Sequence, residues 1–294
     1  MRILLTGARG QVGWELRRTL MVVGEVHAPD SSQLDLRSAQ QLREAVRALK
    51  PDLIVNPAAY TAVDRAESEV ELAMAVNGLA PGVLAEEAVT LGIPLIHFST
   101  DYVFDGTRVG AYREDDEPAP LNIYGRSKLA GEQAVRSVGG KHLILRTSWV
   151  YGPRGANFFI TMNRLLRDRV ELNIVADQVG APTSARLIAE ATAQLVGRLM
   201  NDTAAVSGTF HLTSSGSCSW FEFAQAIAEG IRNREPDTPL ARLHPIPASD
   251  YPAPARRPSN SRLDLGRLET MFGLSMPDWR TVLALVQDEY GLLR

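Results

Sequence analysis

The chain has 294 residues, 45% of them hydrophobic and 22% charged, which excludes disordered, collagen-like and low-complexity proteins. Its 31 Lys and Arg nearly balance 34 Asp and Glu, and the net charge of −3 argues against a nucleic-acid-binding surface, which needs a basic excess. Apolar runs stay short of the roughly 18 residues that span a bilayer, and the amino terminus does not resemble a signal peptide. We therefore expect a soluble protein that binds neither nucleic acid nor membrane.

Strands and helices alternate through the first half of the chain. Short apolar segments predict strands at residues 2–7, 25–30, 51–56, 94–100 and 141–147. Helical patterns lie between them, at about 11–23, from Ser38 onward, at 69–91 and from about 124. Ser38 followed by Gln41 predicts an N-terminal capping box. This alternation predicts an α/β fold with a doubly wound, Rossmann-like parallel sheet.

The last hundred residues read differently, because few strands are convincing there and a Pro-rich segment covers residues 251–258. We predict a dinucleotide-binding domain over residues 1–150, joined by part of 183–215. A smaller C-terminal substrate-binding lobe is expected over 151–294. The single cysteine, Cys218, cannot form an internal disulfide, which is typical of a cytoplasmic protein, and it has no nearby His to activate it. We interpret it as structural or incidental.

A glycine-rich loop follows the first predicted strand with the spacing G-x-x-G-x-x-G. Glycine permits a tight turn and a close approach of backbone N–H groups to a pyrophosphate, and the following helix adds partial positive charge. A plain strand-to-helix turn is the alternative. We predict that the loop binds a dinucleotide through Gly7, Arg9, Gly10, Gln11, Val12 and Gly13.

The residues beside this loop bear on the choice of cofactor. Asp30 ends the second predicted strand, where an acid commonly holds the adenosine ribose hydroxyls of NADH. Arg9 could instead meet the 2′-phosphate of NADPH. We therefore expect tolerance of both cofactors, with Asp35 and Leu36 flanking the adenine, although an Asp that caps a loop or leads a helix is an equally ordinary interpretation.

Tyr124 and Lys128 are four residues apart and share one face of a predicted helix. An ammonium group lowers the pKa of a nearby tyrosine, which suits proton transfer to a carbonyl oxygen. Lys128 is one of only three lysines in a chain that otherwise uses arginine. Thr100 ends the fourth predicted strand, at the sheet edge where ligands bind, so its hydroxyl could polarise the same carbonyl. An exposed helix face and a strand-end cap are the alternatives.

These motifs together resemble the extended short-chain dehydrogenase/reductase family. The resemblance rests on the glycine loop, the segment Ser99–Phe104 and the Tyr124–Lys128 pair, in that order. Further segments are similar to the family's branch of dTDP-4-dehydrorhamnose reductases, and they span nearly the whole chain: residues 10–16, 56–64, 146–151, 177–183 and 257–263. Pro57 and Tyr60 depart from the usual Ala and His, at the cofactor edge rather than at the chemistry.

The resemblance implies reduction of the C4 keto group of dTDP-4-dehydro-6-deoxy-L-mannose by NADPH or NADH, giving dTDP-L-rhamnose. It implies that Tyr124 donates the proton, that Lys128 binds the nicotinamide ribose and lowers the tyrosine pKa, and that Thr100 bonds the substrate oxygen. The cofactor would also contact Ala59, Tyr60 and Thr61.

We predict substrate contacts from Thr100, Asp101, Trp149 and Arg257. Arg257 is flanked by prolines that would preorganise its cation for the diphosphate, and a solvent-facing arginine is the alternative. For Trp149, a structural buried aromatic is the alternative.

Other functions remain open at this stage. A nucleotide-sugar dehydratase carries Thr-Asp-Glu where this chain has Tyr102, and an epimerase would share the Tyr–Lys pair. A non-catalytic, cofactor-binding regulatory subunit of methionine adenosyltransferase is a third alternative. Some family members form homodimers through Mg²⁺ held by glutamates, for which Glu15 and Glu190 are candidates, although a solvated helix face explains both as well. No metal is predicted at the catalytic site.

Overall fold

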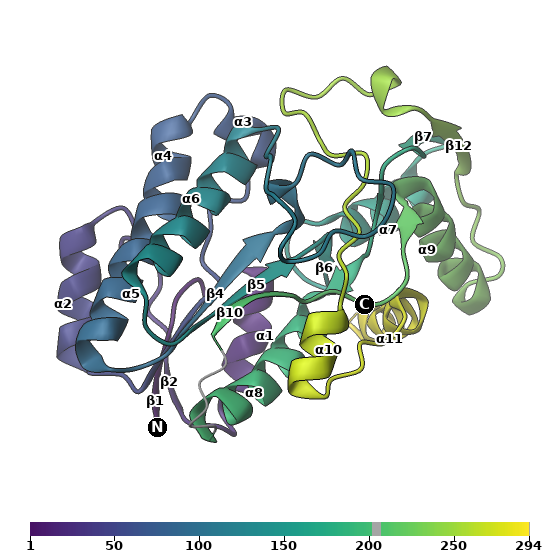
Figure 1. The fold of residues 1–294 in the computed structure, drawn as a ribbon. Coiled ribbons are helices and arrows are strands. Elements are labelled where there is room, and N and C mark those ends of the chain that lie inside the picture. The colour runs from purple at the N-terminus through teal and green to yellow at the C-terminus, as the bar shows by residue number, and fades with distance from the viewer. Residues whose placement is uncertain (202–206, 294) are drawn as a thin grey trace.

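A six-stranded sheet forms the centre of the structure, a computed structural model that describes residues 1–201 and 207–293. Every neighbouring pair of strands is parallel, which confirms the predicted doubly wound α/β fold (Figure 1). In spatial order the strands are β10 (Gly208–His211), β5 (His142–Thr147), β4 (Leu95–Thr100), β3 (Leu53–Asn56), β1 (Arg2–Leu5) and β2 (Glu25–His27).

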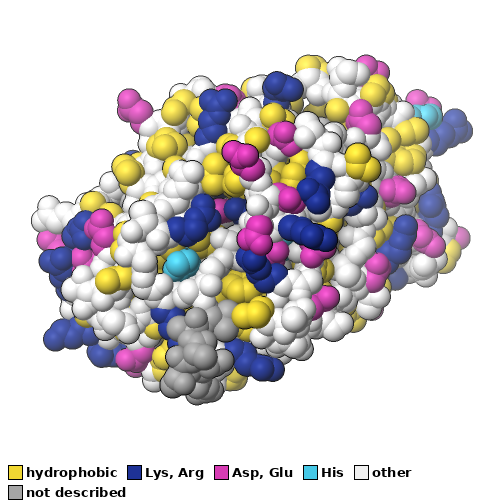
Figure 2. Space-filling view, viewed as in Figure 1, with side chains coloured by type: hydrophobic (Ala, Val, Ile, Leu, Met, Phe, Trp, Pro, Cys, Tyr) yellow, Lys and Arg dark blue, Asp and Glu magenta, His cyan; other side chains and the backbone are white. Residues whose placement is uncertain are grey.

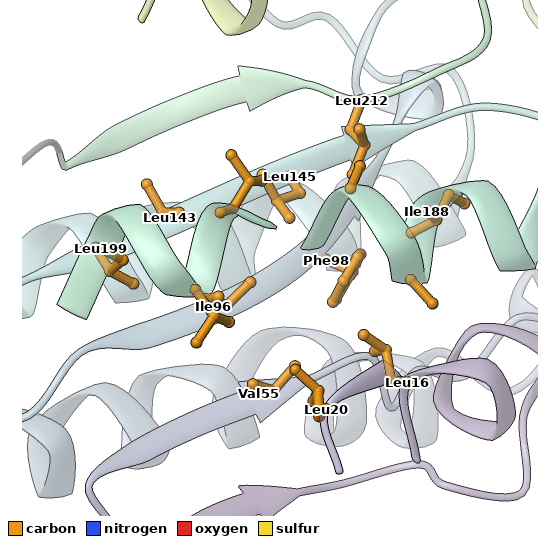
Figure 3. Packing of buried hydrophobic residues seen from close by; sticks show 14 of the residues in the cluster. Leu16, Leu20, Val55, Ile96, Phe98, Leu143, Leu145, Ile188, Leu199 and Leu212 are labelled. Carbon is orange, nitrogen blue, oxygen red and sulfur yellow. The ribbon is translucent and has the colours of Figure 1, made fainter. Parts of the chain in front are cut away.

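Helices cover both faces of this sheet. On one face, α1 (Gln11–Thr19) and α8 (Ala185–Asn201) pack against side chains such as Ile96 and Leu145, as Figure 3 shows. On the other face, the sheet buries residues such as Ile54 and Ile144 against α2 (Ala39–Leu49), α5 (Ala80–Leu91) and α6 (Ile123–Val138). Because side chains alternate along each strand, a continuous apolar run supplies both cores at once.

Several predicted elements need local corrections. The strands predicted at 2–7 and 25–30 end at Leu5 and His27, so Asp30 follows β2 rather than ending it. Helix α1 ends at Thr19 rather than near residue 23. The predicted helix at 69–91 consists of α4 (Val70–Met74), a π-helical turn (Ala75–Leu79) and α5. Ser38 caps α2 as expected by accepting the Gln41 N–H, but the Gln41 side chain accepts from the Asp35 N–H, so the capping box is not reciprocal.

The segment Val70–Leu91 is also long and apolar enough to cross a membrane by length and composition. However, 56% of its most apolar window is buried inside the protein. Such burial is what a core helix shows, and this one packs between α2 and α6.

A second hydrophobic core lies beyond β5. It is built mainly from α7 (Phe158–Asp168), α9 (Trp220–Arg234) and α11 (Trp279–Leu292), with the parallel pair β7 (Glu171–Val175) and β12 (Arg242–Ile246). Cys218 is buried there, and burial raises the pKa of its thiol, in agreement with a structural role. Short pieces complete the region: β6 (Val150–Tyr151), β8 (Val179–Gly180), β9 (Thr183–Ser184), β11 (Cys218–Ser219) and a 3-10 turn (Ala248–Asp250). Helix α10 (Gly266–Phe272) instead packs beside β10 in the core of the main sheet.

The last hundred residues therefore hold more strands than the sequence indicated, including β10 of the main sheet. Its four residues begin with a glycine and include a histidine, so they lack the apolar run of a buried strand. Residues 202–206, within the stretch expected to return to the first domain, lie outside the described residues. Acidic and basic side chains are intermingled over the face shown in Figure 2.

Candidate active site

A cavity of about 1040 Å³ lies at the carboxyl edge of the main sheet. Its wall is formed by the segments that follow β1, β2, β3, β4 and β5. Strand β1 pairs with β2 on one side and with β3 on the other, so the chain changes direction at this edge. Such a switch point is where open α/β sheets bind ligands.

The glycine loop at the cavity needs its glycines for steric reasons. Gly7 has φ +59°, and a Cβ there would lie 2.7 Å from the Ala58 Cα. At Gly13 a Cβ would lie 2.1 Å from the Gly7 carbonyl oxygen, so only glycine lets α1 approach β1 this closely. Gly10 precedes α1 without a side-chain cap, and the first turn of α1 carries no acid. The loop therefore fits a bound pyrophosphate.

Arg9 of the loop and Asp30, which follows β2, form an ion pair with 2.6 Å between Nη2 and Oδ2. Hydrogen bonds from Ser32 and the charge of Arg9 lower the pKa of the Asp30 carboxyl. Asp35 is paired with Arg37 in the same way, at 2.7 Å. Arg9, expected to bind NADPH, and Asp30, expected to bind NADH, are thus ion-paired with each other.

The segment after β3 is held by Asn77 of the π-helical turn. The Asn77 side chain accepts the Tyr60 N–H at 2.8 Å and donates to the Tyr60 carbonyl at 3.0 Å. Its Nδ2 also donates to the Ser127 hydroxyl of α6. A π turn inside a helix often lies at a functional site. No sequence pattern predicts this π turn, so the sequence analysis did not identify Asn77 as a site residue.

Tyr124 and Lys128 lie on α6 facing the cavity, as expected from their spacing. The Lys128 ammonium is buried and donates to the Phe98 carbonyl oxygen at 2.6 Å. Helix α6 can begin here because residue 125 is glycine: a Cβ would lie 2.2 Å from the Tyr102 carbonyl oxygen, in the 3-10 turn Asp101–Val103.

The pKa values of Tyr124 and Lys128 differ from what their spacing in the sequence predicted. Burial raises the pKa of Tyr124 to about 12, partly offset by the Thr100 hydroxyl, and the Asp101 charge raises it further. Burial lowers the pKa of Lys128 to about 8, opposed by Glu132. The expected lowering of the tyrosine pKa by Lys128 is therefore not found, because burial dominates the Tyr124 pKa and the Lys128 ammonium is bonded to a backbone carbonyl.

Glu132 lies one helical turn beyond Lys128 and is fully buried. It accepts two hydrogen bonds from Arg146 of β5, at 2.7 and 2.9 Å, and one from Ser99 at 2.6 Å. These contacts hold the pKa of Glu132 below its usual value despite burial. These buried bonds between Glu132, Arg146 and Ser99 therefore hold α6 against β4 and β5 of the sheet.

Two stacked tryptophans form another part of the wall. Trp149 and Trp220 have ring centroids 3.5 Å apart and almost parallel planes. Trp149 adopts φ +47°, which is rare and strained for a bulky residue and is often found at functional sites. A Cβ on Gly180 would lie 2.5 Å from the Trp149 ring, so glycine is required there. Trp220, at the start of α9, was missed by the sequence analysis.

Two predicted site residues do not line the cavity. Tyr60 donates its hydroxyl to Glu69, with 2.6 Å between the oxygens, and only its neighbours Ala59 and Thr61 line the wall. Arg257 is ion-paired with Asp64 at 2.8 Å and lies beside Tyr102. The other predicted cofactor, catalytic and substrate residues all line it: Gly7, Arg9, Gly10, Gln11, Val12, Gly13, Asp30, Asp35, Leu36, Ala59, Thr61, Thr100, Asp101, Tyr124, Lys128 and Trp149.

The glutamates considered for Mg²⁺ are not arranged as a metal site. Glu15 accepts from Arg186 at 3.3 Å, and Arg186 also binds Glu289 at 2.8 Å. Glu190 is exposed. Within residues 1–201 and 207–293, no group of three or more His, Cys, Asp or Glu could hold a metal ion.

Comparison with known proteins extends these observations over the whole chain. A family model described as RmlD substrate binding domain matches residues 1–291. The chain is 50% identical over 290 residues to a dTDP-4-dehydrorhamnose reductase of Burkholderia thailandensis, covering 97% of each chain. It is 45% identical over 294 residues to one of Escherichia coli, covering 98% of each. A solved dTDP-4-dehydrorhamnose reductase from Bacillus anthracis, in complex with NADP, is 35% identical, with TM-score 0.87 over 100% of this chain and 99% of that one.

Proposed function

The chain belongs to the RmlD family, with relatives that include dTDP-4-dehydrorhamnose reductases, and we propose that it reduces dTDP-4-dehydro-6-deoxy-L-mannose to dTDP-L-rhamnose. The observation that carries this proposal is one cavity lined by the glycine loop at one end and by Thr100, Tyr124 and Lys128 at the other. The cavity is large enough for a dinucleotide and a sugar to meet.

NADPH or NADH, when bound, supplies the hydride for C4 of the sugar. Among the residues that line the cavity, the glycine loop would hold the pyrophosphate, Arg9 and Asp30 would bind the adenosine ribose, and Asp35 and Leu36 would flank the adenine. The backbone from Ala59 to Thr61 borders the cofactor. Lys128 places its ammonium where it can bond the nicotinamide ribose.

Tyr124 is the proton donor in this proposal. With a pKa of about 12 its hydroxyl stays protonated at neutral pH, so it can donate to the ketone oxygen. The alkoxide that forms at C4 is more basic than a phenolate, and proton transfer from Tyr124 is therefore favourable. Thr100 provides a second hydrogen bond to the same oxygen.

The substrate occupies the end of the cavity bordered by Asp101, Trp149 and Trp220. Arg257 then binds the diphosphate after exchanging Asp64 for the phosphate oxygens, since the glycine loop is already taken by the cofactor. We assign cofactor binding to residues 1–150 with part of 183–215, and substrate binding mainly to the remainder of 151–294. A cytoplasmic location and a homodimer belong to the same proposal.

The test is turnover of dTDP-4-dehydro-6-deoxy-L-mannose with NADPH, with the dTDP-rhamnose product identified by mass and NMR. Tyr124→Phe should lower kcat by about 10²–10⁴, the range of general acid catalysis, because it removes the donated proton. NADPH affinity should change little. Tyr251→Phe, at an exposed tyrosine outside the cavity lining, is the control.

Near-normal turnover by Tyr124→Phe would contradict its role. Faster turnover of UDP- or GDP-linked 4-keto sugars would contradict the proposed nucleotide. Cofactor binding without any oxidation of NADPH would favour a regulatory protein.

A further inference from the structure

The Thr100 hydroxyl has one hydrogen and two lone pairs. It accepts the Tyr102 N–H at 3.2 Å and donates its hydrogen to Asp101 Oδ1 at 3.0 Å. The Thr100 hydroxyl also interacts with the Tyr124 side chain. While its one hydrogen is donated to Asp101, none is left for a ketone oxygen, which is the contact that the proposed function requires of it. The carboxyl of Asp101 therefore controls what Thr100 can do.

Asp101 lies in an unusual place for a carboxylate. It is 2% exposed and borders the cavity, and its Oδ2 atom has no hydrogen-bond partner among the described residues. The ionisable side chains that interact with it are Tyr102 of its own turn and Tyr124 of α6. Ser148, after β5, and Ser261 contribute hydroxyl groups from the other sides.

Burial raises the pKa of Asp101 to about 6, and the hydroxyls of Ser261, Thr100 and Ser148 offset this only in part. A dTDP-sugar would displace water from the cavity and bring the negative charge of its diphosphate. Both effects disfavour a carboxylate further. The substrate complex thus favours protonation of the Asp101 carboxyl near physiological pH.

We propose that Asp101 is a positioning residue that enters the substrate complex as a neutral acid and donates its O–H to Thr100, which frees the Thr100 hydrogen for the ketone oxygen. This inference rests on the proposed function. Asp101 takes one proton from solvent when the substrate binds and keeps it through turnover, while the proton given to the sugar comes from Tyr124. Two donors, Thr100 and Tyr124, then meet the oxygen on which negative charge develops.

Proton uptake on binding tests this directly in the unmodified protein. Calorimetric titration of the NADP⁺-loaded protein with dTDP-L-rhamnose at pH 7, in buffers of different ionisation enthalpy, measures it. With a pKa of about 6 the free carboxyl is mostly ionised at pH 7, so we expect uptake of most of one proton per site. Asp101→Asn should abolish the uptake. Asp105→Asn, four residues on and outside the cavity lining, should keep it.

Substitutions at Asp101 provide the second arm. Asn can donate from its amide to Thr100, as the neutral acid does, whereas Leu of similar size cannot. We expect kcat/KM of Asp101→Leu to lie about tenfold below that of Asp101→Asn, the scale of one lost hydrogen bond. Between pH 5.5 and 7.5 the native enzyme should lose kcat/KM as pH rises, and Asp101→Asn should not.

Binding without proton uptake, or Asn and Leu variants of equal activity, would overturn the role of Asp101 alone. A protein that does not bind dTDP-L-rhamnose at all would overturn the proposed function together with it. A purely structural role would lower activity equally at every pH, which also contradicts the proposal.

Discussion

Lys128 is a lysine in a chain of 28 arginines, and its surroundings explain the exception. Its ammonium is buried and bonded to the Phe98 carbonyl, with Glu132 one turn beyond. A planar guanidinium is larger and directs its N–H groups in a fixed fork, whereas the protein acceptor bonded to this cation is a single backbone carbonyl. The compact point charge suits a group that must bond both the protein and a ribose hydroxyl.

The Lys128 pKa of about 8 gives the first prediction for single residues. Burial lowers this pKa from 10.5, so the ammonium is present below about pH 8 and is lost above it. NADPH affinity should therefore fall about tenfold from pH 7 to pH 9, measured by fluorescence titration. Lys128→Met should bind NADPH weakly with no such pH dependence. A native protein with constant affinity over this range would contradict the role of Lys128 at the ribose.

The Arg9–Asp30 ion pair gives a second prediction, on the choice between NADPH and NADH. With NADPH, Arg9 can leave Asp30 for the 2′-phosphate, and with NADH the pair can stay together while Asp30 accepts the ribose hydroxyls. Arg9→Ala should weaken NADPH about tenfold, the scale of a charge-assisted hydrogen bond, and barely alter NADH. Dissociation constants for both cofactors check this. Equal losses for the two would show that Arg9 does not meet the phosphate.

Among the elements, the Pro-rich segment 251–258 is tied to the first domain at several points. Asp64, in α3 (Val63–Ala66), binds Arg257 and also accepts the Ala255 N–H at 3.2 Å. Asn122, the N-cap of α6, donates to the Arg256 carbonyl at 2.7 Å. The helix that carries Tyr124 is thus linked at its first residue to the segment that carries the expected phosphate ligand.

This segment offers a matched pair of variants. Arg257→Ala should raise the KM for the dTDP-sugar roughly 10–100-fold, the scale of hydrogen bonds to a charged group, with little change in NADPH affinity. Its neighbour Arg256 is exposed, so Arg256→Ala is the control and should leave KM near the native value. The idea fails if the two variants have the same KM.

At the scale of the whole molecule, the first domain is not one stretch of chain. Helix α8 contributes Ile188, Leu195 and Leu199 to the core against the sheet, and Phe272 of α10 joins it from near the carboxyl end. Strand β10 pairs with β5 along four residues. The chain therefore leaves the sheet after β5 and builds part of the second core. It returns with α8 and β10, leaves for α9, and returns again with α10 before α11 completes the second core.

A truncation follows from this connectivity. A fragment of residues 1–150 would expose the face that α8 covers and leave β5 as an open edge. We expect it to aggregate, without cooperative thermal unfolding or NADPH binding, whereas the full chain unfolds cooperatively and is stabilised by NADPH. Circular dichroism melts of both make the comparison. A fragment that melts cooperatively and binds NADPH would show that residues 1–150 are a sufficient domain.

The features that the sequence determines by itself are those set by short separations along the chain. The alternation of apolar runs predicts the sheet, the glycine spacing predicts a close turn, and the four-residue step from Tyr124 to Lys128 puts both on one face, because helix and strand geometry fix what near neighbours do. The glycine loop, the segment Ser99–Phe104 and the Tyr124–Lys128 pair also indicated the family. The ends of helices and strands were predicted less accurately, and β10 was missed because it has no apolar run.

The tertiary structure decided whatever depends on burial or on distant partners. Arg257 meets Asp64 across 193 positions, and Trp149, between β5 and β6, stacks on Trp220 of α9. No local sequence pattern predicts either contact. The pKa of Tyr124 rises rather than falls because all the elements around it exclude water, and desolvation there outweighs one nearby ammonium. Neighbouring residues determine local backbone geometry, whereas the pKa values of buried groups depend on how the whole chain packs.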